Sequence, residues 1–288
     1  KSRVFIRSYI LNMLPEAVWL AEDWNMLFGD GNGENLLGIT NHTGVLPVES
    51  IIKDTIIKGE AGSVKSVESH NGGKDTIVEF TKPYDLMLNG MVITFANAAV
   101  VTDLNKANPI IKMNDRQILL KGVAFAGEET AIANMTFTVN NSFFQSIEAP
   151  NSEDVIKTAF AVMTYAQYYP NAITLNPSDV NAMESEKDTT GRNLGIIKVV
   201  NGVKHIANRP IVESTGMLPG KYFIGDMHMG ASIVDYTNLA LEWAEDVETK
   251  LCNEVVLIAS EEVIFPVYNP WAFAYGDLAE LKEAITKK

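Results

Sequence analysis

Cysteine is nearly absent from this sequence, because Cys252 stands alone among 288 residues. A single thiol excludes an internal disulfide framework and a cysteine-based metal cluster. Long apolar runs are missing as well: stretches such as 91–96 fall far short of the roughly 20 residues that a membrane-spanning helix needs. Basic residues are scarce, with 23 Lys and Arg against 36 Asp and Glu and a formal net charge of −13. Since nucleic-acid binding needs a basic surface, we expect no sequence-specific nucleic-acid partner. Since the apolar runs are short, we also expect no membrane partner.

The motifs of common catalytic and metal sites are absent too. The four histidines include no pair three or four residues apart, and Gly-x-Ser-x-Gly does not occur. Asp226 and His228 could hold a metal from one strand, but a strand ending in a turn is the simpler explanation. Solvent-exposed faces explain the carboxylates between 184 and 188 and the pair Glu261–Glu262. We therefore expect no catalytic residue, no cofactor, no metal site and no enzymatic activity.

What is present is a composition of 47% hydrophobic and 20% charged residues, typical of a folded globular chain. Apolar residues recur near a 3.6-residue period over residues 4–27, which predicts a helix. Pro15 lies inside this stretch and predicts a kink or a break. The glycine-rich residues 30–33 predict the end of the helix. The periodic residues are Ile6, Ile10, Met13, Ala17, Leu20 and Trp24, with Leu14 and Leu27 widening the stripe.

The loop 29–35 superficially resembles a calcium or phosphate loop. A calcium loop of the EF type that started at Asp30 would need a carboxylate at its twelfth position, where Asn41 stands. A phosphate loop would precede a helix, whereas this loop follows one. Its glycines are better explained by a helix stop and a tight turn.

Short β-rich runs separated by Gly, Asn and Pro occupy residues 47–149. Their length and spacing predict a small all-β module with no helix long enough for βαβ units. The predicted strands are 50–58, 63–69, 75–80, 91–101, 117–123 and 135–139.

Helices and strands alternate after residue 150. Ser152 is predicted to cap a helix that ends by Pro170, and Asn176 with Pro177 is predicted to begin a second helix that runs to about Lys187. The further predicted strands are 172–175, 195–200, 210–213, 222–225 and 232–235, followed by two buried strands between 254 and 275 and a helix over 278–285.

Aromatic residues gather at three places without interleaved Lys or Arg. Burial in a core or an interface is therefore expected rather than base stacking. The clusters are Phe143-Phe144, then Tyr165, Tyr168 and Tyr169, and finally Trp271, Phe273 and Tyr275.

Five segments occur in an order that resembles one known family. They are the helix end and Gly-Asp-Gly-Asn-Gly loop of 27–39, the Ala-Ile-Thr-Leu-Asn-Pro-Ser-Asp segment at 172–179 with Lys-Asp and Gly-Arg at 187–192, the strand 208–212, the Gly-x-x-x-x-Gly-Asp strand 220–226, and the closing run 256–273 that ends in Asn-Pro-Trp-Ala-Phe. Over residues 1–45 and 150–275 the chain resembles the major capsid proteins of tailed bacteriophages.

The resemblance implies the α+β Hong Kong 97-type capsid fold, with a peripheral (P) domain that carries a long spine helix and an axial (A) domain at capsomer centres. It implies a virion shell subunit, made in the bacterial host cytoplasm, whose pentamers and hexamers form an icosahedral head around DNA. Scaffolding, portal or decoration proteins are further expected partners. The implied divisions are 1–46 (P domain), 47–149 (inserted β-rich domain), 150–239 (A domain), 240–275 (returning P-domain strands) and 276–288 (C-terminal helix and tail).

Three features depart from the family pattern: the β-rich insertion, Pro15 in the spine helix, and the lack of the N-terminal arm and E-loop that precede this helix in the family. The last feature leads us to expect a fragment, or a chain without an ordered N-terminal region. Three alternatives stay open. One is an encapsulin-like nanocompartment shell, another is a hydrolase or carbohydrate-binding protein that uses the β module, and the third is a β module that binds a host surface or a decoration protein.

The expected site residues serve structure and assembly. Asn176, Pro177 and Asp179 should set a helix start, and replacing Asp179 by Ala should cost about 0.5–1 kcal/mol. Gly191 and Gly225 should lie in turns. The full set is Trp19, Trp24, Gly29, Gly31, Gly33, Asn176, Pro177, Asp179, Gly191, Arg192, Pro210, Gly225, Asp226, Glu261 and Pro270.

Overall fold

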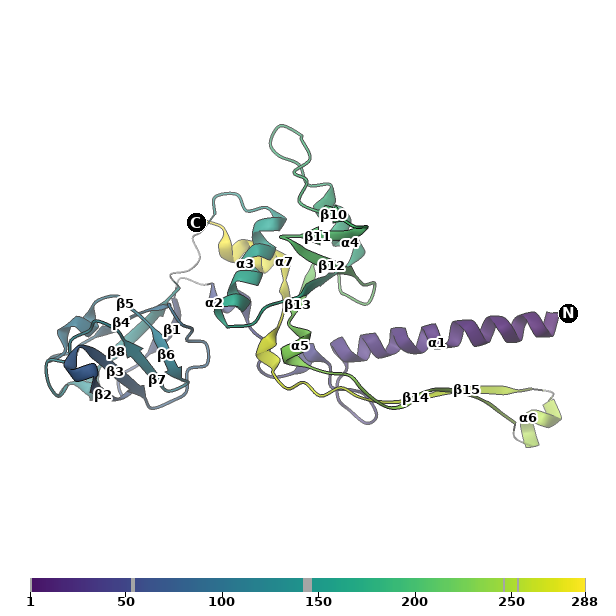
Figure 1. Ribbon diagram of the computed structural model, residues 1–288, viewed down its shortest axis with the longest axis horizontal. Coiled ribbons are helices and arrows are strands. Elements are labelled where there is room, and N and C mark those ends of the chain that lie inside the picture. The colour runs from purple at the N-terminus through teal and green to yellow at the C-terminus, as the bar shows by residue number, and fades with distance from the viewer. Residues whose placement is uncertain (1, 53–54, 142–146, 246, 253, 288) are drawn as a thin grey trace.

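The computed structural model describes residues 2–52, 55–141, 147–245, 247–252 and 254–287. It is a mixed α+β structure with three parts, which Figure 1 shows one after another along the longest axis. At one end lies a β-rich unit, residues 55–140. In the middle lies a body built on a six-stranded sheet. At the other end, a long helix and a β-hairpin project together from the body, and we call this pair the arm.

The arm helix α1 (Ser2–Phe28) confirms the predicted helix, but the predicted break at Pro15 is wrong. Proline removes one backbone N–H and crowds the carbonyl four residues earlier, so the helix loses a hydrogen bond at this point only. The helix continues on both sides of Pro15. None of the described helices is long and apolar enough to cross a membrane.

The β-rich unit consists of two four-stranded antiparallel sheets, in the orders β1-β8-β4-β5 and β2-β3-β7-β6. Three phenylalanines, Phe80, Phe95 and Phe137, are almost fully buried between them. The all-β prediction for this segment is therefore confirmed. The strands are β1 (Thr55–Gly59), β2 (Val64–His70), β3 (Asp75–Phe80), β4 (Val92–Ala96), β5 (Asn108–Pro109), β6 (Ile111–Asn114), β7 (Gln117–Leu120) and β8 (Thr136–Asn140).

Three strand boundaries in this region were predicted wrongly. The strand predicted over 117–123 ends at Leu120. Ser50 lies in a short helix, α2 (Val48–Ile51), and not in the first strand. The strand predicted over 91–101 ends at Ala96, because Asn97 takes a left-handed backbone with φ of 67°. The edge strands β5 and β6 were missed, since they are short and one of them contains Pro109.

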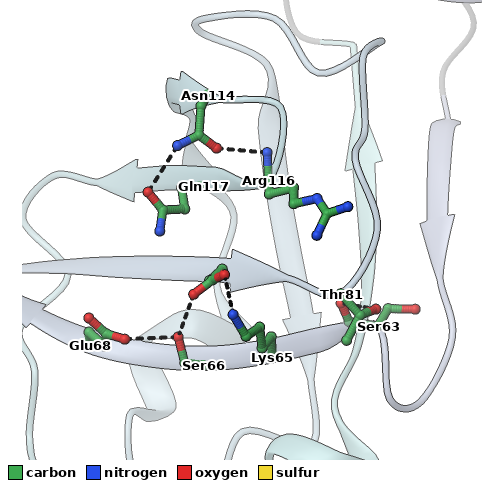
Figure 2. Close-up of polar contacts among 9 residues, drawn as sticks. Ser63, Lys65, Ser66, Glu68, Thr81, Asn114, Arg116 and Gln117 are labelled. Carbon is green, nitrogen blue, oxygen red and sulfur yellow. Dashed lines mark hydrogen bonds and ion pairs between the residues drawn. The ribbon is translucent and has the colours of Figure 1, made fainter.

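The sheet β2-β3-β7-β6 carries a polar network on the face drawn in Figure 2. Lys65 Nζ lies 2.6 Å from Glu79 Oε1, and the Ser66 hydroxyl donates to Glu68. On the neighbouring strands the Asn114 amide donates to Gln117 Oε1 at 3.0 Å. Because the other face of the sheet is apolar and buried, this alternation is the pattern of a sheet with one wet face.

A buried carboxylate, Glu129, organises the loops of the β-rich unit. It is 2% exposed and accepts backbone N–H groups from Ala99, Val100, Val101 and Ala131 at 2.8–3.0 Å. Burial raises the pKa of Glu129, but the four hydrogen bonds outweigh it and hold the pKa below the ordinary 4.5. The ionised carboxylate is therefore the form that fits this site.

Replacing Glu129 by Gln should lower the free energy of unfolding of the β-rich unit by about 2 kcal/mol at neutral pH, because an amide cannot accept four N–H groups. The native pKa is depressed, so the carboxylate stabilises the fold above pH 4.5 and this stabilisation is lost as the pH falls through the native pKa. Urea unfolding from pH 7 to pH 3 should show a weaker acid dependence in E129Q. The exposed neighbour Glu128 provides the matched control E128Q, and equal behaviour of the two variants would contradict the prediction.

The body is built on the sheet β10-β11-β12-β9-β13-β16, in which only the described β12–β9 pair is parallel. Phe273, Tyr222 and Ile224 lie in its core with at most 1% exposure. The strands are β9 (Ala172–Leu175), β10 (Lys198–Val200), β11 (Val203–Ile206), β12 (Arg209–Glu213), β13 (Lys221–Gly225) and β16 (Phe273–Asp277), and the helices are α3 (Ser152–Tyr165), α4 (Pro177–Glu184), α5 (Met227–Gly230) and α7 (Leu278–Ile285).

The helices α3, α4 and α7 agree with the predictions except in details, whereas the short helix α5 was not predicted. The cap of α3 is Asn151 and not Ser152: Asn151 accepts the Asp154 N–H, and Asp154 accepts the Asn151 N–H in return. The helix α4 ends at Glu184, short of the predicted Lys187. The predicted helix 278–285 is confirmed as α7.

The strand β11 was missed although the sequence carries its signal. Asn201 and Gly202 join β10 to β11 with φ of 51° and 83°. Positive φ at both central residues is typical of a type I′ hairpin turn, for which Asn-Gly is the preferred pair. This dipeptide was therefore sufficient to predict the hairpin.

Candidate functional site

The arm brings together two segments that are far apart in the sequence, since α1 packs along a hairpin made of β14 (Val234–Ala244) and β15 (Val256–Ile264). On α1 the half-buried residues include Leu11, Leu14, Val18 and Glu22, which follow one helical face. A two-stranded hairpin is at best marginally stable alone in water. The contact with α1 is thus what supports the hairpin within this chain.

The predicted apolar stripe of α1 lies on its uncovered side. Ile10 is 39% exposed, Met13 46%, Leu20 59% and Trp24 51%, and Trp19 beside them is 54% exposed. Ile10, Met13, Leu20 and Trp24 recur at helical spacing, so they form one face of the helix, whereas Trp19 points to another side. A contiguous exposed apolar face of this kind marks a surface for a partner.

The hairpin also leaves apolar side chains exposed. The prediction of a buried strand after residue 254 is wrong for β15, which alternates between exposed and half-buried residues. Its alternation is that of a strand with one covered face, the face toward α1. The exposed apolar residues of the hairpin include Val234, Tyr236, Val256, Ile258 and Ile264.

An apolar cavity of about 660 Å³ lies where α1 meets the body. Leu20 and Met26 of α1 line it, together with Val212 of β12 and Met227 of α5. The uncovered face of α1 therefore continues onto the body.

Three carboxylates crowd the joint between α1 and the hairpin. One oxygen from each of Glu22, Asp235 and Glu261 lies within 4.8 Å of the other two. Desolvation raises the pKa of Glu22, and the charges of Glu261 and Asp235 raise it further. Among the described residues, these are the ones whose geometry would suit a cation. The predicted site residue Glu261 thus contacts α1 rather than lying on a solvated face.

The loop after α1 folds back and satisfies the end of the helix. Thr40 Oγ1 donates to the Leu27 carbonyl at 2.6 Å, and the Asn41 side chain donates to the Phe28 and Gly29 carbonyls. These carbonyls are among those that a helix terminus leaves unpaired. Gly31 and Gly33 have φ of 69° and 65°, as predicted for a helix stop.

Asp30 holds the turn through its own neighbours. Its carboxylate accepts the Asn35 side-chain amide at 2.9 Å and both the backbone and side-chain N–H groups of Asn32. These bonds, that of Asn35 foremost, lower the pKa of Asp30. The carboxylate is engaged in the loop itself, which agrees with the helix-stop interpretation over a calcium loop.

Gly29 and Gly38 cross at van der Waals contact, and only the former was predicted. A Cβ on Gly29 would lie 2.1 Å from the Leu36 carbonyl oxygen, and one on Gly38 would lie 2.5 Å from the Gly29 nitrogen. Gly38 N–H also donates to the Gly29 carbonyl at 2.9 Å. Gly38 lies within the segment 27–39 that carries the family resemblance, and this was the sequence signal for it.

The helix start at Asn176 is confirmed. The Asn176 side chain accepts the Ser178 N–H at 2.9 Å and donates to the Met217 carbonyl, and Pro177 is the first helical residue. Asp179 Oδ2 accepts the Gly220 N–H at 2.7 Å. Asp179 therefore joins α4 to the turn before β13, a role that its place in the first turn did not reveal.

This contact changes the expected cost of losing Asp179. D179A should lower the free energy of unfolding by about 1–2 kcal/mol, because a charge-assisted hydrogen bond is lost along with the helix-dipole interaction. D179N keeps an acceptor oxygen and should cost less. Urea unfolding of both variants checks this, and a D179A effect no larger than that of D179N would contradict it.

The remaining predicted residues lie in the body. Gly191 has φ of 84° and is a turn residue as predicted, and the Arg192 N–H donates to the Asp188 carboxylate in the same turn. Pro210 pairs with His205 between β12 and β11. Pro270 begins the short helix η5 (Pro270–Ala272).

Gly225 is not in a turn, contrary to the prediction. It is the last residue of β13, and a Cβ there would lie 2.6 Å from the Phe273 ring. Glycine is required by close packing rather than by backbone freedom. Asp226 follows as a 5% exposed carboxylate that accepts the Tyr169 and Met229 N–H groups and caps α5.

The aromatic clusters divide between core and surface. Phe273 is fully buried, whereas Tyr165 and Tyr169 are 42% and 63% exposed. Phe28 at the end of α1 packs edge-on against Tyr275 with ring centroids 5.9 Å apart. Phe143 and Phe144 lie outside the described residues.

Comparison with known proteins gives the class. Residues 118–278, more than half of the chain, match the phage capsid family. The chain belongs to this family, which confirms the resemblance and the expectation of a structural rather than an enzymatic protein. No curated protein matches the chain.

Solved capsid structures are similar to parts of the chain. The capsid of an empty GTA particle is 19% identical, with 42% of this chain and 41% of that chain covered and a TM-score of 0.33. A Mycobacterium phage Ogopogo structure is 15% identical, with 45% of this chain and 52% of that chain covered and a TM-score of 0.36. A virus-like particle from Pyrococcus furiosus is 12% identical, with 82% of this chain and 93% of that chain covered and a TM-score of 0.29. The chain thus spans about half or less of the first two, and the assignment rests on the family match.

Proposed function

We propose that this chain is a major capsid subunit that assembles with copies of itself into a closed icosahedral shell, the DNA-containing head of a tailed phage or prophage. The observation that supports this most directly is the exposed apolar stripe of α1. A lone chain gains nothing from apolar side chains at helical spacing on an uncovered face. A symmetric shell buries such a face in every subunit.

The arrangement of the parts supports the assignment of domains. On this proposal the arm and the loop after α1 are the P domain, with residues 1–46 and the returning strands of 240–275. Residues 150–239 are the A domain, 276–288 form the C-terminal helix and tail, and the β-rich unit within 47–149 is an insertion in the Hong Kong 97-type fold. Scaffolding, portal or decoration proteins are proposed as further partners in the host cytoplasm.

Electron microscopy of the full-length gene product, expressed together with its neighbouring genes, tests the proposal. Closed icosahedral particles are expected. Leu20→Glu should abolish them, since it places a charge in the stripe, while the circular dichroism of the chain should not change. Met113→Glu is the matched control, because Met113 is 50% exposed but lies on the β-rich unit. A product that stays monomeric in all forms would contradict the proposal.

The acidic net charge predicts how strongly the subunit binds DNA. With a net charge of −13, the isolated chain should bind duplex DNA weakly or not at all at physiological salt. An electrophoretic shift assay checks this across salt concentrations. Tight binding that weakens steeply with salt would overturn it.

A further inference from the structure

One contact joins the β-rich unit to the body through a lysine and a tryptophan that are far apart in sequence. Lys112 lies on β6, and its ammonium nitrogen sits 5.9 Å from the centre of the Trp271 ring. Trp271 belongs to η5, directly before the body strand β16. A cation at this distance over an indole face is attracted by the ring quadrupole.

The ammonium group is held in place from the side of the β-rich unit. Lys112 Nζ lies 2.8 Å from Asp115 Oδ1 and donates to the Asp85 carbonyl at 3.2 Å. The Lys112 side chain is 21% exposed. An ammonium has three protons to donate, and a carboxylate, a carbonyl and an aromatic face surround this one.

Trp271 is fixed from the side of the body. It packs against the main hydrophobic core, and the next residue, Ala272, is fully buried. An indole edge also lies close to Gly44, where a Cβ would be 3.6 Å from the ring. Both partners are thus held before they meet, which lowers the entropy lost on contact.

The described strands of the β-rich unit contribute little to the contact between the two parts. Among the described residues, no strand of the β-rich unit makes a broad contact with an element of the body. The short helix α2, which leads into the unit, is anchored to the body instead: its Glu49 accepts the buried Tyr222 hydroxyl at 2.9 Å. Buried apolar residues of the unit and of the body nevertheless belong to one hydrophobic cluster, so the contact between Lys112 and Trp271 acts beside apolar packing.

We propose that Lys112 and Trp271 form a latch that fixes the orientation of the β-rich unit on the body, and that the charge of Lys112 controls whether the unit stays docked. The latch is a property of the single chain and does not depend on shell assembly. Its failure and the failure of the capsid proposal would therefore be distinguishable.

Distance measurements between spin labels test the latch. The labels are placed at K74C in the β-rich unit and E283C on α7, in a C252S background, because both positions are exposed. The parent should give one narrow distance distribution. K112M should lower the docked population relative to undocked forms by about 2- to 30-fold and broaden the distribution. K112R should preserve the narrow distribution, since it keeps the charge over the ring.

The matched control is K106M, which removes a lysine charge from the same unit. Lys106 is 75% exposed and pairs with Asp103, so its loss should leave the distances unchanged. W271L should reproduce the K112M distribution, and combining the two should add nothing further. Distances in K112M that match those in K106M would overturn the proposal.

Discussion

Replacing Gly29 by alanine should lower the free energy of unfolding by about 3 kcal/mol or more and detach the loop after α1 from the helix end. The added Cβ would lie 2.1 Å from the Leu36 carbonyl oxygen and 2.5 Å from that of Asn25. Both are backbone atoms, so a rotamer change cannot relieve the collision. The hydrogen bonds from Gly29 N–H to Asn25 and from Gly38 N–H to Gly29 would be strained as well.

The neighbouring turn glycine gives the control. Gly33 has φ of 65° and no atom within 4 Å of a Cβ, so G33A should cost only about 1 kcal/mol from backbone strain. G38A should resemble G29A, because its Cβ meets the Gly29 nitrogen at 2.5 Å. Urea unfolding and hydrogen exchange over residues 25–41 measure these effects. A G29A effect within 1 kcal/mol of G33A would show that the crossing tolerates a side chain.

Replacing Phe137 by alanine should destabilise the β-rich unit by about 3–5 kcal/mol. Phe137 is 2% exposed, and its ring centroid lies 4.9 Å from that of Phe80, 5.4 Å from Tyr84 and 5.7 Å from Phe95. Truncation therefore removes the ring that contacts all three others. Gly59 also touches this ring, because a Cβ there would lie 2.0 Å from it, so β1 loses a contact too.

Calorimetry distinguishes this effect from a general loss of stability. F137A should lower the unfolding temperature of the β-rich unit and leave the transition of the body in place, because the unit has its own pair of sheets. F137L fills most of the same volume and should cost less than F137A. One cooperative transition that shifts as a whole in F137A would contradict an independently folding unit.

Helix starts, helix ends and turns could be predicted from the sequence, because each depends on residues that are close together in the chain. Asn176 and Pro177 begin α4, and the loop at 30–33 ends α1, because caps and left-handed turns involve residues only a few positions apart. The missed hairpin at Asn201-Gly202 belongs to the same class, since its signal was present.

Signals that depend on distant residues were missed or misassigned. Gly225 was predicted in a turn, whereas the reason for glycine there is the Phe273 ring, 48 positions away in the chain. The hydrogen bond from the Gly220 N–H to Asp179 and the four N–H groups that donate to Glu129 could not be predicted from the sequence either. The burial of β15 was predicted wrongly for another reason. An apolar pattern does not tell whether the surface that covers a strand belongs to the same chain or to another chain.

The pairing of Thr55 with Asn140 makes the first and last residues of the β-rich unit immediate neighbours. Paired residues of antiparallel strands have Cα atoms roughly 5 Å apart. The chain thus enters and leaves the unit at one place, and the contact between Lys112 and Trp271 is a separate connection to the body. A unit connected in this way could be exchanged, enlarged or deleted in evolution without moving the six-stranded sheet or the arm. It could also be replaced experimentally by a foreign domain whose termini are equally close.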